Sequence, residues 1–156
     1  MNATTERSIT VTINGTTYER EVEARKLLIH FVRDDLDLTG SHIGCDTGNC
    51  GACSLIVDGT LVKSCMMLAV QADGATIESV EGLADGDELS KLQEAFRAHH
   101  ALQCGYCTPG MLMSATALLR ANPHPSDDEI KKALQGNICR CTGYWNIFEA
   151  VKAAAE

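Results

Sequence analysis

Apolar and polar residues alternate along the start of the chain. Residues 9–13 read Ile-Thr-Val-Thr-Ile, Asn14 and Gly15 form a typical two-residue hairpin turn, and residues 16–22 lead back as a second strand. Over residues 26–35 the apolar positions recur near helical spacing instead. The pattern predicts a hairpin with one helix packed on it.

Shorter apolar runs follow this helix. Residues 54–57 and 61–65 flank an Asp-Gly turn at 58–59, which predicts a second hairpin. Residues 67–70 and 75–80 predict two more short strands. A hairpin, a helix and further strands in this order predict a small β-grasp sheet.

The composition changes to Gly, Asp and Glu around residues 81–87, and we place a domain boundary there. The predicted domains are residues 1–82, which contain the sheet, and residues 83–156, in which the apolar spacing is helical. At 156 residues, the chain is long enough for two small domains of this kind.

Four helices are predicted in the second domain. The first begins near Asp87 as N-cap. The second begins at Thr108-Pro109, a cap followed by Pro at the first helical position, and ends before Pro123. Ser126 opens a capping box for the third. The apolar positions of the C-terminal segment predict the fourth.

Eight cysteines form one quartet in each predicted domain. The first quartet reads C-x4-C-x2-C-x11-C, the spacing of a plant-type [2Fe–2S] site in which a tight loop delivers three thiolates and a later strand the fourth. The second reads C-x2-C, a long gap, then C-x-C. The members are Cys45, Cys50, Cys53 and Cys65, and then Cys104, Cys107, Cys139 and Cys141.

The first quartet lies in a glycine-rich loop, since residues 44–53 contain three glycines. Glycine tolerates positive φ, so backbone N–H groups can point at cluster sulfurs. The competing interpretation is a glycine-rich hairpin loop with incidental thiols. Disulfides are a further alternative, but cysteines kept reduced inside a cell more often bind metal or perform redox chemistry.

Zinc is the main alternative for the second quartet, because C-x2-C followed by a distant pair describes many zinc sites. Such sites usually close with C-x2-C or a pair of histidines, and not with C-x-C. Arg140 lies between the last two cysteines and either forms a surface salt bridge or tunes the cluster. None of the five histidines lies at ligand spacing with another acceptable ligand, and a Rieske centre lacks its Cys-x-His pairs. Met111 and Met113 fit helix-core packing better than metal ligation.

Composition excludes several classes of function. A formal net charge of −8 argues against nucleic acid as a partner. Residues 1–8 have no signal-peptide pattern, and no apolar run approaches the roughly 20 residues of a membrane span, so we expect a cytoplasmic protein. The sequence lacks nucleotide-binding glycine motifs and a convincing pairing of nucleophile and base. Two metal quartets without a reaction centre predict an electron relay within a larger oxidoreductase.

The whole chain resembles the iron–sulfur subunit of the molybdenum hydroxylases, the xanthine oxidase family. The resemblance covers about residues 7–153 and is carried by residues 44–53, 102–110 and 136–144, where both cysteine motifs are present without substitution. Within that family, residues 27–31 and 39–47 look most like the small subunit of aerobic carbon monoxide dehydrogenases.

The resemblance implies an α+β fold, with an N-terminal β-grasp plant-type ferredoxin-like domain and a C-terminal four-helix bundle domain. It implies that the first quartet holds a [2Fe–2S] cluster near FAD on a medium subunit. The second quartet would hold another [2Fe–2S] cluster near molybdopterin, as the cytosine dinucleotide, on a large subunit. It also implies that Gln103 and Cys141 contact the pterin, and that the complex is a dimer of heterotrimers, which associates with the inner face of the membrane in some cases.

The expected function is therefore electron transfer from molybdopterin to FAD, with no catalytic residue in this chain and carbon monoxide as the first candidate substrate. Dehydrogenases of N-heterocycles, aldehydes or aromatic acyl-thioesters are the alternatives, because the molybdenum subunit chooses the substrate. A free ferredoxin-like carrier and a zinc-stabilised interaction module are the other two hypotheses.

Overall fold

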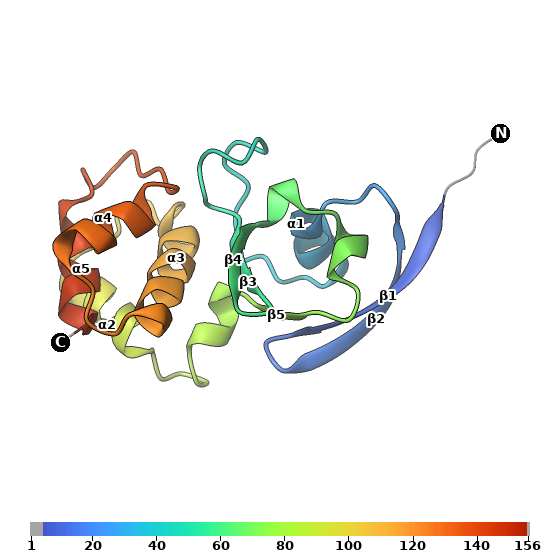
Figure 1. The fold of residues 1–156 in the computed structure, drawn as a ribbon, viewed down its shortest axis with the longest axis horizontal. Helices are drawn as coiled ribbons and strands as arrows, with labels where there is room; N and C mark the ends of the chain where they lie inside the picture. Colours follow the sequence, from blue (N-terminus) through green and yellow to red (C-terminus); the bar gives the residue numbers. More distant parts are fainter. Residues whose placement is uncertain (1–4, 156) are drawn as a thin grey trace.

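A computed structural model describes residues 5–155 as a five-stranded sheet with a group of helices beside it (Figure 1). The described part leaves out residues 1–4 and residue 156, at the ends of the two predicted domains. Residues 1–4 are also half of the segment 1–8, in which we expected no signal peptide. The predicted α+β fold class is confirmed.

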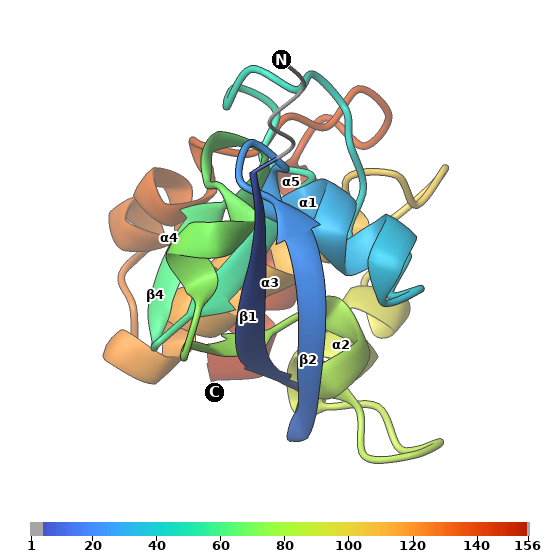
Figure 2. The same cartoon turned by 90° about the vertical axis from the view of Figure 1, so that its right-hand side faces the viewer.

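The sheet has the strand order β2-β1-β5-β3-β4. β1 (Glu6–Ile13) and β2 (Thr16–Glu23) form the predicted antiparallel hairpin, and Asn14 and Gly15 both take the positive φ that its turn requires, at 50° and 82°. β1 also pairs with β5 (Thr76–Glu78) in parallel, and β5 pairs with β3 antiparallel. The β1–β2 hairpin lies on the side of the molecule remote from α4 and α5 (Figures 1 and 2).

One face of the sheet is covered by α1 (Leu28–His30), which continues as a π-helical turn over Phe31–Asp35. This turn of helix provides the apolar face predicted for residues 26–35, and Leu28, Phe31 and Val32 are fully buried. The first hydrophobic core consists of Ile9, Val11, Ile13, Val22, Leu28, Phe31, Val32, Leu55, Val57, Ala69, Ala72, Ala75 and Ile77.

The position of β3 (Ser54–Val57) between two layers of helix explains why its apolar residues do not alternate with polar ones. All four residues of β3 are buried, because α1 lies over one face of the sheet and α3 packs against the other. Leu55 and Val57 belong to the first core. Side chains alternate along a strand, so Ser54 and Ile56 face α3. β3 thus lies between the two halves of the molecule, next to its antiparallel partner β4 (Thr60–Lys63).

The second half contains the four predicted helices, which are α2 (Lys91–Ala98), α3 (Thr108–Ala121), α4 (Asp127–Leu134) and α5 (Trp145–Ala155). The predicted capping box of α4 is present, with Ser126 Oγ accepting from Glu129 N. A separate hydrophobic core joins these helices, and Val80 and Leu83 of the 3-10 turn Val80–Leu83 pack against it.

Three local predictions are wrong. Residues 67–70 form no named strand, because a 3-10 turn, Ala69–Ala72, begins there and buries Ala69 and Ala72 against the first core. Asp87 does not cap α2, because residues 85–88 form a bridged turn and Ser90 caps the helix in a capping box with Gln93. Thr108 is the first helical residue of α3 rather than its cap.

The halves are joined by an ion pair as well as by packing. Arg120 of α3 donates to both carboxylate oxygens of Glu78 in β5, each at 2.7 Å. This bidentate contact lowers the pKa of Glu78. Within residues 5–155, no helix is long and apolar enough to cross a membrane.

Candidate metal centres

The first quartet is assembled by the loop that follows α1 and by the end of β4. Cys45 and Cys50 lie in the loop, and Cys53 directly precedes β3. Cys65 lies in a 3-10 turn, Ser64–Met66, rather than on the predicted strand. Ser64 holds this turn beside Cys53, because its hydroxyl donates to the Cys53 carbonyl at 2.7 Å.

Backbone N–H groups of this loop point at the Cys45 sulfur, as the glycine-rich sequence predicts. Thr47, Asn49 and Cys50 donate to Cys45 Sγ at 3.4, 3.3 and 3.2 Å. Gly48, with φ at 75°, provides the left-handed turn between the first two donors. Such N–H···S bonds stabilise negative charge on sulfur.

The thiols of this quartet differ in pKa, because one is hydrogen-bonded and another is buried. Hydrogen bonds from the Thr47 side chain and from the Cys50 and Thr47 backbone lower the pKa of Cys45 to about 6. Burial, with a hydrogen bond to Cys53, raises the pKa of Cys65 to about 11. One side of the site is therefore dry, and the other is built to hold thiolate.

The second quartet lies at helix boundaries, where the sequence places it. Cys104 and Cys107 precede α3, and Cys139 and Cys141 lie between α4 and α5. Residues 44–53 and 138–143 lie at the same end of the molecule in both views (Figures 1 and 2).

The thiols of the second quartet also differ in pKa, because their hydrogen bonds and their burial differ. The Tyr106 backbone N–H, and then the Cys141 thiol, lower the pKa of Cys104, whereas burial raises the pKa of Cys107 to about 12. Burial also acts to raise the pKa of Cys139, but hydrogen bonds from the Thr142 side chain and backbone outweigh it and lower that pKa.

The four thiols of the second quartet are arranged two by two. Cys141 Sγ donates to Cys104 Sγ at 3.4 Å, and the Cys107 thiol is hydrogen-bonded to Cys139. Two thiolates on one tetrahedral metal with bonds of about 2.3 Å lie about 3.8 Å apart, so the Cys104–Cys141 pair, at 3.4 Å, is close to the spacing of two ligands on one metal. Among the residues that the structure describes, no three His, Cys, Asp or Glu side chains are grouped to hold a single metal ion. A binuclear core, with two thiolates for each iron, needs pairs of this kind.

The second quartet also lines a cavity of about 220 Å³. All four of its cysteines contribute, together with Gly44, Cys50, Ala52, Tyr106, Ile138 and Arg140. The cavity wall contains no carboxylate or imidazole side chain, and a donor set made mainly of thiols suits an iron–sulfur cluster or zinc. A Cβ at Gly44 would lie 2.8 Å from Cys50 Sγ, so glycine keeps this wall open. The residues present therefore fit a [2Fe–2S] cluster.

The two cysteine loops touch through their backbones. The Ile138 N–H donates to the Cys50 carbonyl at 2.9 Å, and Ile138 directly precedes Cys139. Next to it, the buried Asn137 amide donates to the Gly51 carbonyl at 3.2 Å and accepts from Ser114 Oγ at 2.7 Å. The first quartet is thus one hydrogen bond away from the second.

The other predicted site residues lie around the second quartet. Gln103 and Cys141 are exposed, so both are accessible to a partner. Arg140 is exposed at the cavity and forms none of the salt bridges found within residues 5–155. Met111 and Met113 are fully buried in α3, which confirms their packing role.

Sequence reasoning missed the residues that join the loops, namely His42, Tyr106, Gly110 and Asn137. Tyr106 and Asn137 lie beside ligands in the motifs, which was a usable signal. His42 and Gly110 gave none, because their roles depend on contacts with residues about 60 positions away along the chain.

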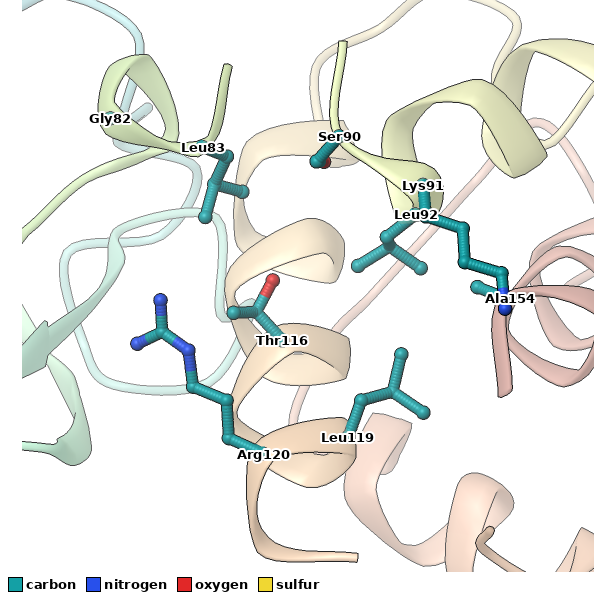
Figure 3. A pocket seen from close by; sticks show the side chains of 9 residues that line it. All are labelled: Gly82, Leu83, Ser90, Lys91, Leu92, Thr116, Leu119, Arg120 and Ala154. Carbon is teal, nitrogen blue, oxygen red and sulfur yellow. The ribbon is translucent and has the colours of Figure 1, made fainter. Parts of the chain in front are cut away.

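A larger cavity, of about 320 Å³, lies between the 3-10 turn Val80–Leu83, α2, α3 and the end of α5. Figure 3 shows the Arg120 and Lys91 side chains on opposite sides of it. No cysteine lines this cavity, and Arg120 is already paired with Glu78. The redox chemistry of the chain therefore belongs to the cysteine quartets.

Comparison with known proteins gives two family models. Residues 11–104 match the 2Fe-2S iron-sulfur cluster binding domain, and residues 79–152 match the [2Fe-2S] binding domain. The residues that each model matches include one complete quartet. Residues 11–104 include Cys45, Cys50, Cys53 and Cys65, and residues 79–152 include Cys104, Cys107, Cys139 and Cys141.

The chain is also similar to known proteins over nearly its whole length. The nicotine 6-hydroxylase small subunit of Paenarthrobacter nicotinovorans is 55% identical over 143 residues, which cover 92% of this chain and 86% of the relative. The caffeine dehydrogenase subunit gamma of Pseudomonas sp. (strain CBB1) is 51% identical, over 94% of this chain and 90% of the relative. A chain in the crystal structure of quinoline 2-oxidoreductase from Pseudomonas putida 86 superposes with a TM-score of 0.93 at 49% identity, covering 96% of this chain and 94% of that chain.

Proposed function

Because the chain belongs to the small iron–sulfur subunits of the xanthine oxidase family of molybdenum hydroxylases, we propose that it relays electrons from a molybdopterin centre to FAD through two [2Fe–2S] clusters. Cys45, Cys50, Cys53 and Cys65 bind the first cluster, and Cys104, Cys107, Cys139 and Cys141 bind the second. We also propose that the halves that carry the quartets are separate domains, residues 1–82 and 83–156, and that the 3-10 turn Val80–Leu83 joins them, because Val80 and Leu83 pack against the second core.

The observation that carries this proposal is the hydrogen bond between the two cysteine loops. The Cys50 carbonyl accepts from the Ile138 N–H at 2.9 Å, so covalent bonds and one hydrogen bond connect Cys50 Sγ to Cys139 Sγ. Cys50 also lines the cavity enclosed by the second quartet. A contact this direct suits a relay, because electrons pass most readily between closely spaced centres.

When bound, each cluster supplies a site that takes up and releases one electron. The chain's own residues hold the thiolates and set their surroundings. The N–H groups of Thr47, Asn49 and Cys50 stabilise charge on Cys45, while burial of Cys53 and Cys65 keeps water from the other side. The exposed Cys104 and Cys141 leave the second quartet accessible from outside.

Partner subunits are supported by the surface around the second quartet. Of eight exposed large hydrophobic side chains in residues 5–155, five lie within four positions of its cysteines: Leu102, Tyr106, Ile138, Tyr144 and Trp145. Aromatic side chains exposed in this way favour a protein interface. We propose that the large subunit covers this surface, where Gln103 and Cys141 contact the pterin, and that the FAD subunit approaches the first quartet. A dimer of such heterotrimers, in the cytoplasm, is the expected assembly.

An N-heterocycle is the substrate we infer for the complex. The relatives described above are named for nicotine, caffeine and quinoline, which are all nitrogen heterocycles. Carbon monoxide, the first candidate from local sequence similarity, gains no support from them. Oxidation of a heterocycle or an aldehyde releases two electrons, which the chain would pass on one at a time.

Metal analysis tests the two-cluster proposal directly. Anaerobically purified chain should contain about four iron and about four sulfide, because each [2Fe–2S] cluster contributes two of each. Elemental analysis combined with visible absorption measures this. Zinc in place of one iron pair would contradict the assignment of the second quartet.

Copurification tests the subunit role. Untagged protein isolated from its native cells should elute with a flavin-containing and a molybdenum-containing polypeptide, because its apolar surface needs a partner. Size-exclusion chromatography with cofactor analysis of each fraction is the measurement. A cluster-loaded monomer free of both polypeptides would instead support a free ferredoxin-like carrier.

A further inference from the structure

One histidine joins the two cysteine loops. His42 lies three residues before Cys45, and its Nδ1 is 2.8 Å from the Tyr106 carbonyl oxygen. The His42 and Tyr106 rings are stacked, with centroids 4.6 Å apart and planes inclined by 23°. Because a carbonyl oxygen only accepts, Nδ1 carries the proton and donates.

Tyr106 is also held at the far end of its side chain. Its hydroxyl donates to the Ile43 carbonyl at 2.7 Å, and its ring lies 3.7 Å from the position of a Cβ on Gly44. The segment leading into Cys45 therefore contacts Tyr106 at three points, which are its carbonyl, its ring and its hydroxyl. We call His42 and Tyr106 the 42–106 clamp.

The clamp acts on a residue that lies between two ligands of the second quartet. Tyr106 separates Cys104 from Cys107, and all three residues line the same cavity. Hydrogen bonding from the Tyr106 backbone is also the first cause that lowers the pKa of Cys104. The peptide group on the other side of Tyr106 is the one that accepts from His42. Any rotation of this residue therefore moves an N–H···S bond.

We propose that His42 is a positioning residue, which holds Tyr106 so that its N–H stays directed at Cys104 and so raises the reduction potential of the second cluster. Hydrogen bonds to ligand sulfur stabilise the reduced, more negative cluster. Through this clamp, the loop of the first cluster sets a property of the second. The inference rests on the proposed [2Fe–2S] assignment but not on any substrate or partner.

The test compares two substitutions of His42 in the cluster-loaded protein. His42→Phe keeps a ring for stacking and removes the donor, whereas His42→Asn keeps a donor N–H at the position of Nδ1 and removes the ring. The potential of the second cluster is followed by redox titration with EPR detection, and its signal is identified as the one lost in Cys104→Ser.

In His42→Phe, the ratio of oxidised to reduced second cluster at a fixed potential should rise three- to tenfold, which corresponds to a fall of about 30 to 60 mV for one electron. His42→Asn should remain close to the wild type. His124→Phe is the matched control, because His124 is exposed beyond the far end of α3, about 20 Å away along a 14-residue helix.

An unchanged potential in His42→Phe would overturn the proposal. Equal shifts in His42→Phe and His42→Asn would also overturn it, because the hydrogen bond would then not be the cause. If His42→Phe loses its second cluster, Tyr106→Phe replaces it, since that change removes only the bond to Ile43. A smaller shift in the same direction is expected there, and no shift would refute the clamp. Zinc in the second quartet would refute the relay instead, so the two failures are distinguishable.

Discussion

Replacing Gly110 by Ala should loosen the contact between the two halves and lower the temperature at which the clusters are lost. A Cβ at Gly110 would lie 2.1 Å from the Gly51 carbonyl oxygen and 2.9 Å from the Ala52 Cα. Both atoms are backbone, so no side-chain rotation relieves the overlap. The first turn of α3 must therefore move away from the loop that holds Cys50 and Cys53.

The expected effect is a net loss of stability, because the cost of the clash exceeds a favourable intrinsic change. Gly to Ala in a helix would by itself stabilise by up to about 1 kcal/mol. Overpacking in a rigid core costs about 1–3 kcal/mol or more, and backbone atoms relax least. The upper end of that range, less the intrinsic gain, leaves a net loss of about 2 kcal/mol, which lowers the melting temperature of the whole 156-residue chain by about 4–8 °C.

The measurement is the loss of cluster absorbance on heating at one fixed scan rate, since loss of clusters makes unfolding irreversible. Gly136→Ala is the matched control. Its Cβ would meet only the end of the Lys63 side chain, with Nζ at 3.5 Å and Cε at 3.7 Å, and Gly136 has no positive φ. This variant should therefore shift the transition by less than about 2 °C. Equal behaviour of Gly110→Ala and Gly136→Ala would show that the close approach at Gly110 is dispensable.

Local signals in the sequence predicted the elements that local interactions determine. The β1–β2 hairpin follows from period-two alternation around Asn14-Gly15, and both residues show the positive φ that such a turn needs. The cap of α4 follows from Ser126 and Glu129, which bond each other reciprocally. In each case the deciding contacts lie within a few residues.

The wrong predictions, for residues 67–70 and for Asp87, fall where contacts outside the local sequence pattern decide the structure. Residues 67–70 are apolar without alternation, a pattern that fits a strand or a buried turn equally well. The choice came from distant contacts: Ala69 N donates to the Lys26 carbonyl, and Leu68 bridges to Leu27. Asp87 and Ser90 are both acceptable caps, and only the pairing of Asp85 with Glu88 removes Asp87 from the helix.

The same holds for the candidate site, where local spacing was predictable and contacts between distant residues were not. Spacing alone grouped the eight cysteines into two quartets, because ligands from one loop are close in sequence. The relation between the quartets was not predictable, since it depends on contacts such as Asn137 to Gly51, 86 positions apart. Those contacts bring Ile138 to Cys50, and they turn two metal sites into a relay.

The division of labour between the quartets gives the last and largest expected effect. Cys50→Ser should lower the iron content from about four to about two per chain, because alkoxide is a harder and weaker ligand for iron than thiolate. The substitution leaves the Cys50 carbonyl in place, so its hydrogen bond to Ile138 and the second quartet should survive. Cys104→Ser is the reciprocal control and should remove the other pair of iron atoms.

In the assembled complex, an N-heterocycle that the wild type oxidises should still reduce the molybdenum centre of Cys50→Ser, because that centre lies upstream. Flavin reduction should slow by about tenfold or more, a barrier increase of at least about 1.4 kcal/mol, because the remaining path must bypass the first quartet. Rapid-mixing spectroscopy at molybdenum and flavin wavelengths separates the two steps. Flavin reduction at the wild-type rate would place the first quartet off the electron path. The 2.9 Å hydrogen bond from Ile138 to Cys50 would then serve only to hold the two loops together.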